Sequence, residues 1–102
     1  MSRRVWATPQ AEAQAHVADE WWREHRHASP ELFYQEFAGA ADMLAAAPEI
    51  GRLYPEGGIP GLRRLLLPRT RYHVYYVLDT ENDEVAILAI WSAVRGRGPK
   101  LG

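Results

Sequence analysis

The sequence of 102 residues contains no cysteine, which excludes disulfide bonds and thiolate metal sites. It has no run of 18 apolar residues, so no segment can cross a membrane as a helix. No apolar stretch of signal-peptide length follows the basic residues near the N-terminus, and we therefore expect a cytoplasmic protein. Internal repeats and a glycine-rich phosphate loop are also missing. The length predicts one domain, residues 1–102, with a single core.

The histidines do not have the spacing of a helical metal site. His16 lies nine and eleven residues before His25 and His27, whereas two ligands on one helical face are four residues apart. His25 and His27 are only two residues apart and point in different directions on a helix. We therefore expect neither a metal ion nor a cofactor.

Acidic and basic residues are distributed unevenly along the chain. Residues 1–58 carry five basic and nine acidic residues, a balance of −4, and residues 59–102 carry seven basic and four acidic residues, a balance of +3. All four acids of the second part fall within residues 79–84. The C-terminal part should therefore present a cationic face, which favours nucleic acid or an acidic protein segment as a partner.

The N-terminal quarter predicts a short strand, residues 4–7, followed by a helix. Thr8 and Pro9 suit the N-cap and the first helical position, where the missing N–H of proline does no harm. The helix should run to about Arg26. Its stripe of apolar and small residues consists of Ala11, Ala15, Ala18 and Trp22, widened by Val17 and Trp21.

A second helix is predicted between the start signal Ser29-Pro30 and Pro48. Proline ends a helix because it pushes the preceding residue out of helical geometry. Only a few residues separate the two helices, so they should pack as an antiparallel hairpin. The apolar face of the second helix consists of Phe33, Phe37, Ala40, Leu44 and Ala47, with Met43 beside it.

Residues 49–60 are rich in glycine and proline and predict a loop, after which three strands follow. The strands are residues 62–67, 72–78 and 84–91, and an acidic turn joins the last two as a hairpin. The predicted fold class is α+β, with the helical hairpin packed on a mainly antiparallel four-stranded sheet that includes the N-terminal strand.

The last two strands are apolar on both faces, although one helical hairpin can cover only one face of a sheet. Within residues 72–78, one face carries Tyr72, Val74, Tyr76 and Leu78 and the other His73, Tyr75 and Val77. Within residues 84–91, one face carries Val85, Ile87, Ala89 and Trp91 and the other Ala86, Leu88 and Ile90. The uncovered face either binds a partner or is covered by the loop around Leu53 and Tyr54.

Five segments, in this order and spacing, resemble the RelE/ParE toxin superfamily, and more closely its ParE branch of plasmid stabilisation toxins. They are residues 6–9 (WATP), 44–51 (LAAAPEIG), 61–65 (GLRRL), 71–77 (RYHVYYV) and 87–97 (ILAIWSAVRGR). The resemblance implies the toxin of a type II toxin-antitoxin system, bound by a cognate antitoxin as a hetero-oligomer. RelE-like members cut messenger RNA on the ribosome, whereas ParE-like members poison DNA gyrase.

The candidate target-binding residues are four arginines, whose planar guanidinium groups suit phosphate or carboxylate: Arg64, Arg71, Arg95 and Arg97. If the protein is an RNase, His73 is the candidate base, with Arg95 and Arg97 stabilising phosphate charge. The tail after Arg97 contains no tyrosine or histidine that could serve as an acid, and Lys100 is the only lysine. The sequence therefore favours a gyrase poison that is not an enzyme over an mRNA endonuclease. We expect the antitoxin to use the sheet face away from the helices and the groove beside the first helix.

Overall fold

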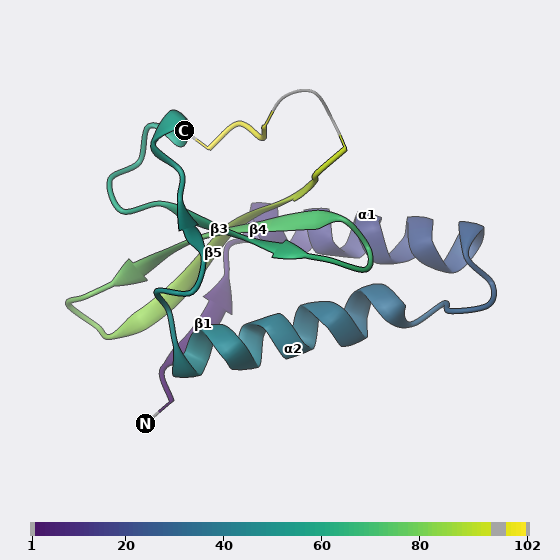
Figure 1. Ribbon diagram of the computed structural model, residues 1–102, viewed down its shortest axis with the longest axis horizontal. Coiled ribbons are helices and arrows are strands. Elements are labelled where there is room, and N and C mark those ends of the chain that lie inside the picture. The colour runs from purple at the N-terminus through teal and green to yellow at the C-terminus, as the bar shows by residue number, and fades with distance from the viewer. Residues whose placement is uncertain (1, 95–97, 102) are drawn as a thin grey trace.

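The computed structural model describes residues 2–94 and 98–101, in which two helices pack on a sheet of five strands (Figure 1). The strand order is β1-β5-β4-β3-β2; β1 runs parallel to β5 and the other pairs are antiparallel. The elements are β1 (Arg4–Ala7), α1 (Pro9–His25), α2 (Leu32–Ala46), β2 (Arg52–Leu53), a 3-10 turn (Pro55–Gly57), β3 (Arg63–Leu67), β4 (Tyr72–Asp79) and β5 (Glu84–Ser92). The α+β class predicted from the sequence is confirmed.

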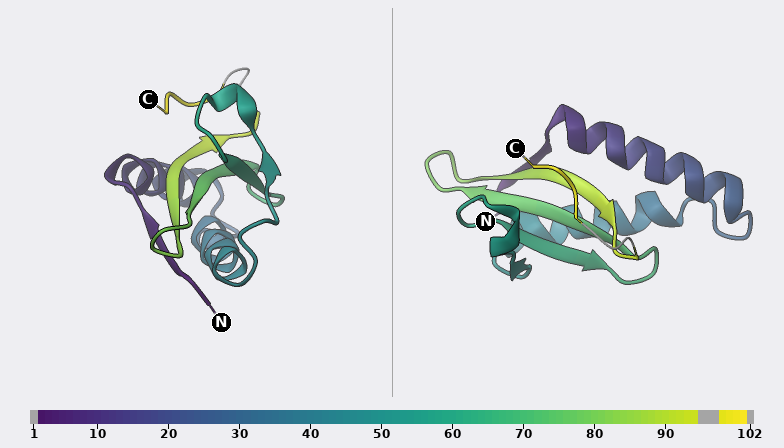
Figure 2. Two further views of the ribbon diagram at one scale, coloured as in Figure 1. Left: turned by 90° about the vertical axis from the view of Figure 1, so that its left-hand side faces the viewer. Right: turned by 90° about the horizontal axis from the view of Figure 1, so that it is seen from above.

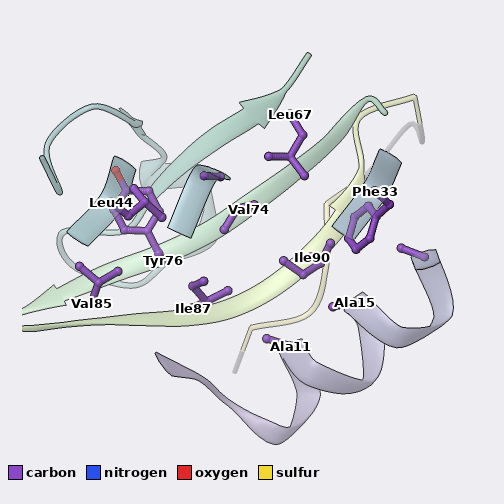
Figure 3. Packing of buried hydrophobic residues seen from close by; sticks show 12 residues of the cluster. Ala11, Ala15, Phe33, Leu44, Leu67, Val74, Tyr76, Val85, Ile87 and Ile90 are labelled. Carbon is purple, nitrogen blue, oxygen red and sulfur yellow. The ribbon is translucent and has the colours of Figure 1, made fainter. Parts of the chain in front are cut away.

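Helix α1 begins as predicted, because the side chain of Thr8 accepts a hydrogen bond from the Ala11 N–H at 3.2 Å. Its alanines pack against the sheet: Ala11 and Ala15 are buried and lie over Ile87 and Ile90 of β5 (Figure 3). The helix ends at His25, one residue before the predicted end. The stripe is narrower than expected, since Val17 and Trp21 remain exposed.

Helix α2 runs antiparallel to α1 (Figure 1), but it begins at Leu32 rather than directly after Ser29. The carbonyl of Ser29 accepts hydrogen bonds from the Leu32 N–H and from the Trp22 ring N–H, so Ser29 belongs to the connecting turn. The helix ends at Ala46, in agreement with the stop expected at Pro48. Phe33, Ala40 and Leu44 of this helix are buried in the core.

Strand β2 lies within the segment predicted to be only loop. It pairs with β3 through Arg52 opposite Arg64 and Leu53 opposite Arg63. The Arg63 guanidinium group donates hydrogen bonds to the carbonyls of Gly51 at 2.7 Å and Glu49 at 3.1 Å. These bonds fix the chain before β2 against the edge of the sheet. The glycine- and proline-rich composition of residues 49–60 does not indicate this strand.

A β-bulge interrupts the alternation of β5. Tyr75 pairs with Ala89 and Tyr76 pairs with Ile87, so Leu88 is the extra residue. Ile87 and Ile90 therefore both face the helices, whereas strict alternation placed them on opposite faces. Ala89 faces the other side of the sheet with Tyr75. The predicted division of the β5 residues is wrong after Ile87 for this reason.

Part of the sheet face away from the helices is covered within the chain itself. Tyr75 and Ala89 are buried there, and Tyr54, Ile59 and Leu101 pack against them. Figure 2 shows the loop after α2 and the C-terminal residues on the side of the sheet opposite α2. The coverage by the loop that the sequence left open is therefore found around Tyr75, whereas Leu66 on the same face is 37% exposed. No helix in the described part of the chain is long and apolar enough to cross a membrane.

Candidate functional site

Strands β3 and β4 bring together three of the residues predicted as functional: Arg64, Arg71 and His73. Leu66 stands opposite His73 and Arg64 stands opposite Tyr75, so Arg64 and His73 share the face away from the helices. Burial lowers the pKa of His73 below 6.5, and the positive charges of Arg64 and Arg71 lower it further. The imidazole is therefore neutral at pH 7, and its surroundings carry positive charge.

The Arg64 side chain is held by aromatic rings. Its guanidinium carbon lies 4.5 Å from the centre of the Tyr54 ring, and Nη1 is 3.5 Å from the Tyr75 hydroxyl. Tyr54 meets Tyr75 edge-to-face with 5.3 Å between ring centres. Arg64 thus fastens the loop that contains Tyr54 to the sheet through a cation–π contact.

Nuclease chemistry needs an acid beside the base and the cations. The neutral His73 ring could accept a proton, and the centre of the Tyr75 ring lies 6.0 Å from it. Tyr75 is only 1% exposed, however, so its hydroxyl cannot serve as an acid for a leaving group in a bound RNA. Arg95 and Arg97, the other members of the predicted RNase set, lie outside the described residues.

The turn between β3 and β4 has a partner that the sequence did not reveal. The Glu36 carboxylate on α2 accepts hydrogen bonds from the N–H groups of Arg69 and Thr70 and from the Thr70 hydroxyl, at 2.7–2.9 Å. Glu36 is one of several acids on a helix, and its spacing gives no sign of this contact. Arg71 follows directly, with a φ of 67°.

A groove of about 330 Å³ lies between α1 and the end of β5. Strand β1 pairs with β5 only as far as Ile87, and beyond it the Ile90 N–H donates to the Gln14 side chain at 2.8 Å. The groove is largely apolar and includes Val17 and Trp21, which are 65% and 40% exposed. Exposed apolar side chains beside a groove form a surface against which a partner segment can pack.

No group of three or more histidine, aspartate or glutamate side chains in the described ranges is arranged to hold a metal ion. The arginines around the neutral imidazole are suited to an anionic partner. The groove is suited to a partly apolar segment.

The chain was compared with models of protein families, with curated proteins and with solved structures. The model of the family described as "ParE toxin of type II toxin-antitoxin system, parDE" matches residues 5–96. No curated protein matches the chain. Similar solved structures have identities near 20%, and this likeness concerns the fold.

One is the chromosomal ParDE toxin-antitoxin system from P. aeruginosa, with a TM-score of 0.68, 20% identity, and coverage of 89% of this chain and 96% of that chain. Another is the RelBE2 toxin-antitoxin complex from Mycobacterium tuberculosis, with a TM-score of 0.64, 21% identity, and coverage of 90% and 99%. The E. coli RelBE complex has a TM-score of 0.57 at 17% identity, with coverage of 92% and 100%.

Proposed function

Because the chain belongs to the family of ParE toxins of type II toxin-antitoxin systems, we propose that it arrests growth by binding DNA gyrase rather than by cutting RNA. The observation that supports this choice is the surrounding of His73. The charges of Arg64 and Arg71 act on the ring, and the neighbouring Tyr75 hydroxyl is buried, so within residues 2–94 and 98–101 we identify no accessible acid beside His73. Loss of a positioned acid or base reduces the rate of an enzyme by about 10²–10⁴, so we assign a binding role to this surface. Gyrase acts on DNA in the cytoplasm, where this toxin would therefore act.

A RelE-like mRNA endonuclease is the second candidate. One observation favours it: the lowered pKa keeps His73 neutral, as a general base must be near pH 7. Arg71 lies near enough to influence this pKa and could contact the scissile phosphate. The partner in this case is the ribosome with its bound message.

Two assays on the induced toxin decide between these functions. A gyrase poison inhibits supercoiling by purified gyrase, and His73→Ala retains this inhibition apart from modest destabilisation. An endonuclease leaves codon-phased cuts in translated messages, detected by primer extension, and His73→Ala abolishes them. Cuts of this kind, lost in His73→Ala, would overturn the gyrase proposal. The control variant is His16→Ala, which changes an exposed histidine on α1 that is paired with Glu20.

Toxins of this family have an antitoxin as partner, and we place its binding site in the groove between α1 and β5. Tyr54 and Leu101 pack on part of the sheet face away from the helices, so of the two antitoxin surfaces expected from the sequence we favour the groove. Burial of Val17 and Trp21 by apolar antitoxin side chains would supply the affinity.

The groove is tested by measuring antitoxin affinity for Trp21→Ala, which should fall at least about tenfold because a large aromatic anchor is lost. Tyr34→Ala on α2 removes a ring of similar exposure, 43% against 40%, and should bind the antitoxin like the unmodified chain. Equal losses for the two variants would count against the groove as the docking site.

A further inference from the structure

The turn between β3 and β4 contains an arginine in a backbone conformation that arginine rarely adopts. Arg71 has a φ of 67°, and in the described ranges the other non-glycine residue with positive φ is Asp83. Among non-glycine residues, aspartate is enriched in the left-handed region, whereas arginine is not, and glycine is favoured there. The Arg71 side chain is therefore present despite a conformational cost.

Hydrogen bonds on both sides fix the backbone of this residue. The Arg71 N–H donates to the Leu67 carbonyl at 2.8 Å, and the Arg71 carbonyl accepts from the Ala93 N–H at 2.7 Å. The preceding residues are held by the carboxylate of Glu36, and Thr70 is buried. The surroundings thus enforce the left-handed conformation and fix the direction in which the Cα–Cβ bond of Arg71 leaves the backbone.

The Arg71 side chain makes no contact that explains why an arginine is needed there. It is exposed, and within residues 2–94 and 98–101 it has no salt bridge or hydrogen bond. Its charge is felt by His73, whose pKa it helps to lower. Strain that the fold maintains without a stabilising contact is found at functional sites.

The surface around Arg71 is cationic and apolar together. Arg69 is exposed in the same turn, Leu66 is 37% exposed on β3, and Val94 is 76% exposed just after Ala93. Apolar side chains beside arginines suit a protein surface, because a DNA backbone offers them nothing to pack against. The net charge of the chain, −1, also gives no general attraction to DNA.

We propose that the β3–β4 turn, residues 68–71, is the surface through which the toxin contacts its target, with Arg71 as the contact residue and Glu36 as a positioning residue. The partner is a protein surface that presents carboxylates beside apolar side chains. This inference rests on the proposed function to the extent that the chain acts by binding a target protein.

The decisive variant is Arg71→Gly, because it removes the charge and at the same time suits the backbone. The melting temperature should be unchanged or higher, since glycine adopts a φ of 67° without strain. Growth arrest after induction should be lost, and the concentration for half-inhibition of gyrase should rise about 10- to 100-fold, as expected for a lost charge-assisted hydrogen bond. Arg71→Lys should retain part of the activity.

The matched control is Arg52→Ala. Arg52 is an exposed arginine on β2, an edge strand of the sheet, and lies outside the β3–β4 turn, so its removal should leave growth arrest unchanged. The proposal is overturned if Arg71→Gly folds and arrests growth as strongly as the unmodified toxin. If the unmodified toxin arrests growth through Arg71 but does not inhibit gyrase, the gyrase assignment fails and the turn remains the contact surface.

The role of Glu36 is tested with Glu36→Gln, which retains one acceptor oxygen, against Glu36→Ala, which removes both. Partial toxicity for the first and none for the second, with both variants folded, supports a positioning role; full toxicity of folded Glu36→Ala overturns it.

The chemistry of the partner is tested with a short DNA duplex alone. The assignment to a protein surface would be overturned if the toxin binds this DNA and Arg71→Gly reduces the slope of log affinity against log salt concentration by about one unit.

Discussion

Tyr76 joins the middle of the sheet to the chain that leaves α2, and its hydroxyl group provides a sharp test of the packing described above. The ring is fully buried. The hydroxyl donates a hydrogen bond to the Pro48 carbonyl at 2.7 Å and accepts one from the Gly51 N–H at 2.8 Å. Both backbone groups belong to buried residues, so water cannot easily replace the hydroxyl when it is removed.

Tyr76→Phe leaves these two backbone groups without their partner while it retains the ring. Each unsatisfied buried donor or acceptor costs about 1–3 kcal/mol. Because the backbone around the two groups can relax in part, we expect Tyr76→Phe to lower the free energy of unfolding by about 2–4 kcal/mol. This is a large part of the roughly 5–15 kcal/mol that stabilises a domain of ordinary stability. A change of this size should lower the melting temperature by about 8 °C or more.

Urea denaturation followed by circular dichroism measures this difference, with Tyr34→Phe as control because Tyr34 is exposed on α2. A free energy of unfolding for Tyr76→Phe within about 0.5 kcal/mol of the unmodified chain would refute the reasoning, since surface substitutions have effects of that size.

Three further predictions concern pH and local packing. Burial and the nearby arginines lower the pKa of His73. Between this lowered pKa and about pH 6.5, the unfolded chain binds a proton that the folded chain does not, so the free energy of unfolding decreases as the pH falls through this interval; NMR titration should give a pKa below 6.5. Gly51→Ala places a Cβ atom 2.5 Å from the Tyr76 hydroxyl oxygen and 2.9 Å from the Arg64 carbonyl, and urea denaturation should show destabilisation by about 1–3 kcal/mol. Thr8→Ala removes the N-cap of α1 and should lower the unfolding free energy by about 1 kcal/mol in the same assay, whereas an unchanged value would exclude a stabilising cap.

The sequence predicted those parts of the fold that depend on local patterns. The buried alanines of α1 follow the helical stripe, and Thr8 caps the helix as its chemistry suggests. The late start of α2 could not be foreseen, because the Ser29 carbonyl is engaged by the Trp22 ring N–H, a contact between separate turns of the chain. The bulge at Leu88 was equally hidden, since its cause lies in the pairing of β5 with β4 and β1 rather than in the residues of β5 alone.

Some features of the candidate site also follow from local sequence patterns, and others depend on contacts between distant residues. Strand register brings Arg64 and His73 to one face, and this could be inferred from alternation along β3 and β4. The contact of Glu36 with the β3–β4 turn joins residues more than thirty positions apart and has no signature in the sequence. The positive φ of Arg71 is hidden too, because glycine or asparagine is the usual sign of such a position.

The proposed antitoxin groove and the proposed target surface are neighbours, and this suggests how neutralisation could work. Tyr72 pairs with Ser92, and both residues line the end of the groove between α1 and β5. Arg71 directly precedes Tyr72, and its carbonyl accepts the hydrogen bond from Ala93, the residue after Ser92. An antitoxin segment that fills the groove to this end therefore reaches the residue next to Arg71. Under both proposals, the antitoxin can block target binding by covering the turn, without any change in the toxin fold.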